Sequence, residues 1–488
     1  MLRVPALSDR TPSVLAEVNV GTLDVDRLIE LLDGPEAEAA REAAAHARDR
    51  LAERSVWNVN STARGGGVAE MLVTLLAYAR GAGVDTRWLV IEGDPEFFTV
   101  TKRIHNRLHG TPGDGGPLGP AEREAYDATL GRNCEALLQR VAPSDIVILH
   151  DPQTAGLITP LREQGIPVIW RCHVGIDDPN DLAQEAWNFL APYVRQADIV
   201  VFSRPEFAWD VVDADRRTII APSIDALAPK NQELEPGAAA AILAAARIGA
   251  GAPNGARPVF KRFDGTMDTV TAAARIDEDR PLGDGERYVL QVSRWDRLKD
   301  PAGVIQGFAE HVAPRADAHL IYAGPAVEAV ADDPEGAAVL QQALAQRAEL
   351  EPPVRERVHL AMLPMDDLEE NAAIVNALQR EAAVVVQKSL AEGFGLTVAE
   401  AMWKARPVVA SRIGGIADQI EDGRSGVLLD DATDLATYGA AVIGLLEDPE
   451  RAAAMGAAAR QRVRERFLGT HSLVEYFALF ERILAGSK

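Results

Sequence analysis

Two glutamates stand eight positions apart around a Gly-Phe-Gly in the segment KSLAEGFGLTVAEAMW, residues 388–403. The hydrophobic run before it predicts a buried strand, and the alanine-rich run after it predicts a helix that begins near Leu396. The two glycines permit a tight turn that brings backbone amides and the positive end of the helix close to a ligand, which suits a phosphate. Glu392 and Glu400 could then accept hydrogen bonds from hydroxyl groups on its two sides. The alternative is that Glu392 caps the helix and Glu400 is a solvated helix residue.

A second group follows the predicted strand YVLQVS, in the segment RWDRLKD. Arg294 and Lys299 lie there at the carboxyl end of a strand in the same half of the chain as the two glutamates. An arginine fork and a lysine together could neutralise a diphosphate. Taken alone, such a pair is more often an ordinary surface feature.

The first half of the chain has polar residues at its own strand ends. NVNSTARGGGVAEML joins a strand to a helix through Gly65–Gly67, and it lacks the Gly-x-Gly-x-x-Gly spacing of a dinucleotide site. It is either a loop that approaches a ligand or a simple tight turn. Asp151 and His173 also stand where strands end, although a lone histidine is more often packed than functional.

Lys102, His105 and Asn106 are spaced three and four apart in TKRIHNRLHG, which places them on one face of a predicted helix. That face could bind a polyhydroxylated molecule or simply meet water, and the pattern leaves both open.

These residues need a scaffold, and its composition sets limits. The chain has 488 residues, 47% hydrophobic and 25% charged, as expected of two globular domains. The net charge of −23 disfavours nucleic acid and anionic membrane surfaces, so an anionic substrate must meet a local cluster of positive charge. Lysine is rare, with seven among the fifty basic residues, so Lys299 and Lys388 stand out.

The termini and cysteines indicate a compartment. No apolar run is long enough to span a bilayer, and the first residues lack the pattern of a secretory signal. Two cysteines, Cys134 and Cys172, fit a reducing environment without disulfides, and the lack of clustered histidines argues against structural zinc. We therefore expect a cytoplasmic protein without a metal site.

Short β-branched runs alternate with helical stretches throughout, which predicts an α/β protein with parallel sheets. In the first half the predicted strands are 55–61, 86–92, 145–151, 167–174, 198–203 and 218–223. In the second half they are 287–293, 318–324, 357–363, 382–388, 407–411 and 426–430. Six strands in each half predict two doubly wound domains. We interpret the proline-rich segment 221–237 as the connection between the two domains. The alanine-rich segment 36–53 is predicted to be a helix that serves as a packing or self-association surface.

The motifs resemble a known family. SRWDRLKD, EGFGLTVAE and GGI resemble the retaining glycosyltransferases of GT-B fold, in which two Rossmann-like domains face each other across a cleft. In the first half, VNSTARGGGVAEML, HDPQTAG, WRCHVGIDDPN and PSIDALAPKN narrow the resemblance to the trehalose synthases of the glycosyltransferring type and the related retaining trehalose phosphorylases. The resemblance covers residues 55–430, except for the stretch 245–285.

The resemblance implies two domains with separate tasks. Residues 1–225, joined by a final helix at 470–488 that crosses back, would bind the acceptor, and residues 226–469 the nucleotide sugar. It implies catalytic roles for Arg294, Lys299, Glu392 and His173, donor contacts from Gly393, Phe394, Gly395, Leu396 and Glu400, and acceptor contacts from Gly65, Gly66, Gly67, Asp151, Lys102 and Asn106.

The activity implied is reversible transfer of glucose, with retention, from ADP-glucose or UDP-glucose to glucose, which yields trehalose. Glu400 would hold the ribose and Glu392 the glucose hydroxyls, the basic pair would hold the diphosphate, and His173 would lie near the 6-hydroxyl of the transferred sugar. No cofactor or metal is implied, because the basic pair does a cation's work. We expect a homodimer that binds neither nucleic acid nor membranes.

Two alternatives stay open. A trehalose phosphorylase would use inorganic phosphate and yield glucose 1-phosphate, and related phosphorylases can retain the same glutamate pair. A protein of another class, an inactive sugar-nucleotide sensor, would close on its ligand without turnover, although Glu392, Arg294 and Lys299 argue for catalysis.

Overall fold

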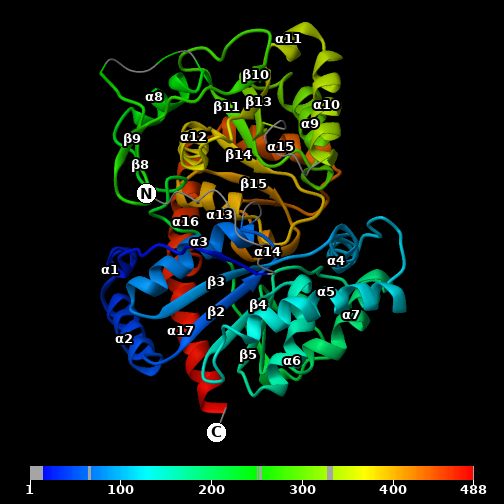
Figure 1. The fold of residues 1–488 in the computed structure, drawn as a ribbon. Coiled ribbons are helices and arrows are strands. Elements are labelled where there is room, and N and C mark those ends of the chain that lie inside the picture. The colour runs from blue at the N-terminus through cyan, green and yellow to red at the C-terminus, as the bar shows by residue number, and fades with distance from the viewer. Residues whose placement is uncertain (1–14, 64–66, 250, 252–254, 327–333, 487–488) are drawn as a thin grey trace. The chain divides into compact units, whose positions relative to one another are not determined.

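The chain forms two compact units in a computed structural model that describes residues 15–63, 67–249, 251, 255–326 and 334–486 (Figure 1). Unit 1 comprises Met1–Ser223 and Gly469–Lys488, and unit 2 comprises Ile224–Leu468. The last helix of the chain therefore belongs to the first unit.

Unit 1 is built on a seven-stranded sheet in the order β1-β3-β2-β4-β5-β6-β7. Its strands are β1 (Leu15–Val18), β2 (Ser55–Asn60), β3 (Asp85–Ile91), β4 (Ile146–His150), β5 (Val168–Cys172), β6 (Ile199–Phe202) and β7 (Arg217–Ile219). All pairings are parallel except that of β1 with β3 at the edge. The six parallel strands follow the doubly wound order 2-1-3-4-5-6, whose direction reverses between β2 and β4.

Helices cover both faces of this sheet because successive strand residues point to opposite sides. Val56 belongs to the core beneath α1, α2 and α17, and its neighbour Trp57 belongs to the core beneath α4, α5 and α7. The helices of unit 1 are α1 (Val25–Ile29), α2 (Gly34–Arg50), α3 (Gly67–Gly81), α4 (Pro95–Leu108), α5 (Pro120–Leu138), α6 (Ile158–Glu163), α7 (Asp181–Val194) and α17 (Gly469–Gly486). The alanine-rich helix α2 packs against α17, so its apolar face is core.

Unit 2 has a seven-stranded sheet of its own in the order β10-β13-β12-β11-β14-β15-β16. Its strands are β10 (Arg275–Asp277), β11 (Tyr288–Val292), β12 (His319–Pro325), β13 (Val358–Leu363), β14 (Val384–Gln387), β15 (Val408–Ser411) and β16 (Val427–Leu429). Apart from the antiparallel edge strand β10, the order is 3-2-1-4-5-6, that of the dinucleotide-binding folds. A separate hairpin pairs β8 (Val259–Lys261) with β9 (Met267–Thr269).

The helices of unit 2 alternate with its strands. They are α8 (Ala238–Ala245), α9 (Pro301–Gly307), α10 (Pro334–Ala348), α11 (Pro352–Arg355), α12 (Leu368–Glu381), α13 (Leu396–Trp403), α14 (Gly414–Gln419), α15 (Leu435–Leu446) and α16 (Pro449–Arg466). Short turns of other helix types include η4 (Arg297–Lys299) after β11. Helices α9, α10 and α15 contribute to one apolar core with the sheet, while α12 contacts β11 and α13 contacts β14 and β15.

The predicted α/β organisation is confirmed. Each of the twelve parallel strands lies where the sequence places one, with bounds that differ by at most four residues. The prediction misses β1, β10 and the β8–β9 hairpin, all of them antiparallel pieces of three or four residues. Such short edge strands carry too few residues for an alternating pattern to show.

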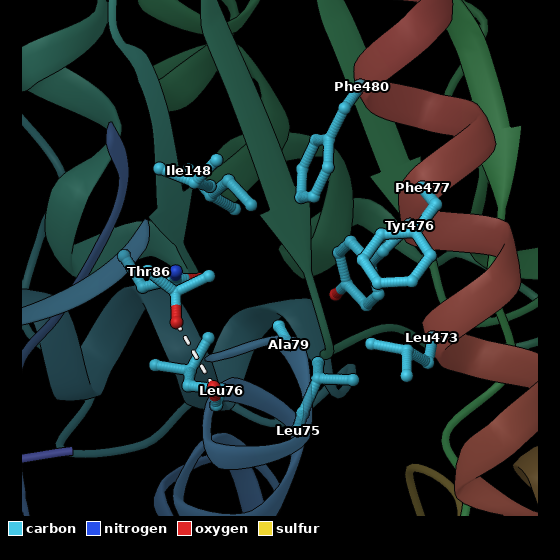
Figure 2. A pocket seen from close by; sticks show the side chains of 11 residues that line it. Leu75, Leu76, Ala79, Thr86, Ile148, Leu473, Tyr476, Phe477 and Phe480 are labelled. Atoms are coloured by element: carbon cyan, nitrogen blue, oxygen red, sulfur yellow. Dashed lines mark hydrogen bonds between the residues drawn. The ribbon is translucent and has the colours of Figure 1, made fainter. Parts of the chain in front are cut away.

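Helix α17 closes one face of the first sheet, and a small pocket remains beneath it (Figure 2). The pocket is lined by Val56, Asn58, Leu75, Leu76, Ala79, Thr86, Ile148, Leu473, Tyr476, Phe477 and Phe480. Thr86 donates its hydroxyl to the carbonyl of Leu76 (3.1 Å) and so turns away from the apolar side chains. The pocket lies between helix and sheet, and most of its walls are apolar, although Nδ2 of Asn58 and the hydroxyl of Tyr476 are buried there without a hydrogen-bond partner among the described residues.

Among the helices of the described residues, none combines the length and apolar composition that crossing a bilayer requires. Cys134 and Cys172 are both buried and free, as the sequence predicts.

Candidate active site

The strand order of unit 2 reverses between β11 and β14, and ligands of doubly wound folds bind at such a reversal, beyond the carboxyl ends of the strands. The loop after β11 carries Arg294 and Lys299, and the loop after β14 carries Glu392 and the Gly-Phe-Gly turn. The two loops are joined where the amide of Leu390 donates to the carbonyl of Leu298 (2.7 Å). The two signals that the sequence analysis found separately thus lie side by side.

Lys299 and Glu392 form an ion pair across these loops. The Nζ atom of Lys299 donates to Oε2 of Glu392 at 2.5 Å, and both side chains are more than four-fifths buried. The Lys299 loop is itself fixed, because Gln291 donates its side-chain amide to the carbonyl of Lys299 (2.7 Å). An anionic group that entered here would compete with Glu392 for the lysine.

The Gly-Phe-Gly turn has no room for larger residues. Gly395 has φ +83° and precedes α13, a left-handed conformation that favours glycine. Gly414 and Gly415 of the GGI segment pack against the turn: the amide of Gly415 donates to the carbonyl of Gly393 (2.9 Å), and a Cβ on Gly414 would lie 1.9 Å from the carbonyl oxygen of Glu392. The GGI segment therefore belongs with the turn because it sets the path of the backbone around Glu392.

Glu400 lies on α13, which begins at Leu396 as predicted. Only 3% of the residue is exposed, which excludes the solvated-helix alternative. Its Oε2 is buried and has no hydrogen-bond partner among the residues that the structure describes, while Oε1 lies 3.6 Å from Nζ of Lys230. A buried carboxylate oxygen without a partner is costly, so this one is placed to receive a donor from a ligand.

Arg294 is not brought to the same point. Its side chain is 63% exposed and pairs with the carboxylate of Asp296 (3.1 Å) two residues along the chain. Within the described part of the chain, no ion pair or hydrogen bond joins Arg294 to Glu392.

In unit 1 the strand order reverses between β2 and β4, and Asp151 directly follows β4. Asp151 has φ +63°, unusual for any residue but glycine, and its Oδ1 accepts from the backbone amide of His173 (2.8 Å). Burial raises the pKa of the Asp151 carboxyl to about 7, despite that hydrogen bond and the nearby Arg171. Asp151 and His173 therefore form one strained, partly buried unit at the edge of the sheet.

The imidazole of His173 stacks on that of His150, the last residue of β4. Their Nε2 and Nδ1 atoms lie 3.3 Å apart, and Nε2 of His150 lies 3.1 Å from Oδ1 of Asn58 on β2. Burial, together with the Arg171 charge, lowers the pKa of both histidines. His173 is thus neutral near pH 7 and suited to exchange hydrogen bonds with an uncharged hydroxyl.

The structure does not link the other residues predicted to contact the acceptor to Asp151 and His173. Gly65 and Gly66 lie outside the described residues, and Gly67 begins α3. Lys102 and Asn106 lie on α4 as expected, Lys102 exposed and Asn106 partly buried. No hydrogen bond or ion pair among the described residues links either of them to Asp151 or His173.

Sequence reasoning singled out Lys388 without giving it a role and missed the other supporting residues. The buried Lys388 pairs with Asp300, whose other oxygen caps α9 by accepting from the amide of Gly303 (3.0 Å). The buried Lys404 donates to the carbonyl of Glu400. The scarcity of lysine singled out Lys388, and the same signal applied to Lys404 and Lys230 would have found them.

No group of three or more histidine, cysteine, aspartate or glutamate side chains in the described ranges is arranged to hold a metal ion.

Comparison with known proteins identifies the family. Residues 58–209 match the model of the trehalose synthase N-terminal domain, and residues 273–462 match that of the glycosyl transferases group 1. The chain is 34% identical over 435 residues to a trehalose synthase of Pyrococcus horikoshii, covering 89% of this chain and 91% of the relative. It is 36% identical over 438 residues to a trehalose synthase of Rubrobacter xylanophilus, covering 89% and 92%. The chain belongs to the trehalose synthase family of glycosyltransferases.

Two further comparisons concern a more distant relative and a solved structure. A trehalose phosphorylase of Pleurotus sajor-caju is 28% identical over 413 residues, covering 78% of this chain and 52% of the relative, and is therefore more distant. The solved structure of a UDP-forming alpha,alpha-trehalose-phosphate synthase from Burkholderia xenovorans matches with a TM-score of 0.64 at 15% identity, covering 88% of this chain and 99% of that structure. The two Rossmann-like units are thus those of the GT-B fold, and the chain is a glycosyltransferase.

Proposed function

We propose that this glycosyltransferase makes trehalose, reversibly and with retention, from a nucleoside diphosphate glucose and glucose. One observation carries the proposal: Lys299, Glu392 and Glu400, whose Oε2 has no hydrogen-bond partner among the described residues, lie around a glycine turn at the strand reversal of unit 2. This is an arrangement for a diphosphate flanked by two sets of hydroxyl groups. It occurs in a chain more than one-third identical to proteins named trehalose synthase.

Binding of the donor would break the ion pair between Lys299 and Glu392. A diphosphate oxygen takes the place of the Glu392 carboxylate on Lys299, and Glu392 then accepts hydrogen bonds from glucose hydroxyls. As the bond between the anomeric carbon and the β-phosphate oxygen breaks, negative charge grows on the diphosphate. Lys299, the amides near Gly395 and the exposed guanidinium of Arg294 stabilise that charge, which is electrostatic catalysis.

The acceptor sugar would bind to unit 1 through Asp151, with Lys102 and Asn106 as further contacts, and His173 would hold the transferred glucose. The acceptor's anomeric hydroxyl attacks on the face that the diphosphate leaves, and its proton passes to the departing phosphate oxygen. A new carbon–oxygen bond replaces the one that breaks, and the configuration is retained. No protein nucleophile takes part in this scheme.

The scheme requires neither a cofactor nor a metal, because Lys299 supplies the positive charge. We also propose a cytoplasmic homodimer. The two free cysteines fit a reducing compartment, and size-exclusion chromatography with light scattering tests the dimer.

The direct test incubates trehalose separately with ADP, UDP and inorganic phosphate and identifies the products. We expect a sugar nucleotide and glucose from at least one nucleotide, and no sugar phosphate. Glucose 1-phosphate from phosphate alone would instead establish a phosphorylase, and no turnover in any arm would indicate a sensor. Repeating the active arm with a chelator tests the metal-free scheme.

A further inference from the structure

The carboxylate of Glu400 has an uneven environment. Its Oε2 is buried without a hydrogen-bond partner among the described residues, whereas Oε1 lies 3.6 Å from the ammonium of Lys230. The Lys230 side chain is one-fifth exposed, so it lies at the margin of the buried region. A ligand that reaches Oε2 therefore also comes within reach of a positively charged donor.

The position of Lys230 is fixed by its neighbours in the chain. The side-chain amide of Asn376, on α12, donates to the carbonyls of Pro229 (3.0 Å) and Gln232 (2.9 Å). The indole of Trp403 donates to the carbonyl of Asn231 (3.2 Å). The backbone on both sides of Lys230 is thus held against buried helices.

The same fixation ties Lys230 to Glu400. The buried ammonium of Lys404 donates to Oδ1 of Asn231 (2.9 Å), to Gln379 (2.8 Å) and to the carbonyl of Glu400 (3.1 Å). One buried cation therefore holds both the loop of Lys230 and the helix of Glu400, which sets the distance between the two side chains. Burial of a charge is costly, and its use here indicates that the arrangement needs to be kept.

A pair made of one acceptor and one charged donor is complementary to two adjacent hydroxyl groups. One hydroxyl donates to the open oxygen of Glu400, and the oxygen of its neighbour accepts from Lys230. We propose that Lys230 is a specificity-determining residue of the donor site, which acts with Glu400 to read the 2′,3′-diol of the nucleoside and so selects ribonucleotides over deoxyribonucleotides. This inference rests on the proposed function, in which Glu400 faces the ribose.

The test measures binding of ADP, 2′-deoxy-ADP and 3′-deoxy-ADP by calorimetry to the wild type and to Lys230→Met. In the wild type we expect both deoxy analogues to bind at least about tenfold more weakly than ADP, because each loses a hydrogen bond to a charged group. We expect the affinity of Lys230→Met for ADP to be lower than that of the wild type by a similar factor. The affinity for one deoxy analogue should be almost the same in Lys230→Met as in the wild type. The hydroxyl that this analogue lacks is the one that Lys230 contacts.

Two further variants separate a specific role from a structural one. Lys261→Met changes an exposed lysine of β8 in the same unit and should bind all three nucleotides like the wild type. Lys230→Arg keeps a charged donor and should recover part of the selectivity. Should Lys230→Met misfold, Lys230→Gln, which keeps an uncharged donor, takes its place in the comparison.

The outcomes distinguish this inference from the proposed function. If ADP does not bind, the same series is run with UDP and its two deoxy analogues, and a wild type that binds neither nucleoside diphosphate overturns the proposed function and the inference with it. A wild type that prefers ADP, with a Lys230→Met variant that weakens all three nucleotides equally, overturns the inference alone, because Lys230 then acts only as bulk charge or packing. A collapse of the preference for ADP supports it.

Discussion

The lysines of this arginine-rich chain gather around one turn. Of the seven, Lys230, Lys299, Lys388 and Lys404 contact residues of the two loops and the helix that form the proposed donor half-site of unit 2. Lysine suits these places because its ammonium is a compact charge with three donors on a flexible stem, whereas arginine is a wide, rigid fork. At the residue scale, lysine thus stands where a compact cation meets one oxygen, as at Lys299, or several closely spaced oxygens, as at Lys404.

Of these four lysines, Lys299 is the one whose substitution should lower catalysis most. We expect Lys299→Ala to lower kcat/KM about 10²- to 10³-fold, because the charge on the departing diphosphate loses its nearest cation, while folding is kept. Initial rates with ADP-glucose or UDP-glucose and glucose, together with thermal unfolding, measure both effects. The control is Arg297→Ala, an exposed residue of the same η4 turn, which should act like the wild type. Unchanged turnover in Lys299→Ala would remove the proposed site.

At the scale of elements, the donor half-site depends on how closely α14 approaches the Gly-Phe-Gly turn. We expect Gly414→Ala to abolish most activity, because its Cβ would lie 1.9 Å from the carbonyl of Glu392 and the turn must move. Gly423→Ala is the matched control: both glycines have left-handed φ angles, +46° and +74°, but Gly423 has open space around it. Gly423→Ala should lose about 1 kcal/mol of stability from backbone strain and keep its kcat/KM, whereas Gly414→Ala should lose more stability because of the clash and should also lose kcat/KM. Equal losses of activity would contradict this account.

The ion pair of Lys388 and Asp300 joins the end of β14 to the start of α9. We expect Lys388→Met to cost about 3–5 kcal/mol of unfolding free energy, because it leaves Asp300 without its cation in a buried place. Adding Asp300→Asn, which still caps Gly303, should recover part of that loss. Urea unfolding of the two single variants and the double variant measures the coupling. Strictly additive effects would show that the pair contributes nothing as a pair.

The parallel elements could be predicted from the sequence because each strand is a buried β-branched run flanked by helical stretches. The closeness of the segments after β11 and β14 could be predicted as well, since both follow parallel strands of one sheet. The structure joins Lys299 to Glu392 there. The contacts of Lys230 with Glu400 and of Lys404 with Asn231 could not be predicted, because they link residues 170 or more positions apart whose spacing carries no local pattern. Nor does the sequence reveal that Arg294 pairs with its neighbour Asp296.

At the scale of the whole molecule, unit 1 is discontinuous. Its core includes Leu473, Tyr476, Phe477 and Phe480 of α17, which pack over β2, β4 and the helices α2 and α3 (Figures 1 and 2). These side chains come from the far end of the chain, yet they fill the same core as Val56 and Ile148. The stability of the first unit therefore depends on residues that follow the whole of the second.

Phe480 tests this dependence. We expect Phe480→Ala to destabilise unit 1 by about 3–5 kcal/mol, since it removes a buried ring beside an existing small pocket. Phe98→Ala, at a partly exposed phenylalanine of α4, should cost less than half as much. Denaturant unfolding followed by tryptophan fluorescence compares the two, and equal costs would contradict the role given to α17.

The membership of α17 in unit 1 has a consequence for biosynthesis. As the chain leaves the ribosome, residues 1–223 emerge first, but the part of the sheet face that α1 and α2 do not cover stays open until residues 469–486 have been made. Unit 2, encoded by one uninterrupted stretch, can complete its core in the meantime. The domain that is translated first is thus finished last, and its open face is the one that a chaperone would need to shield.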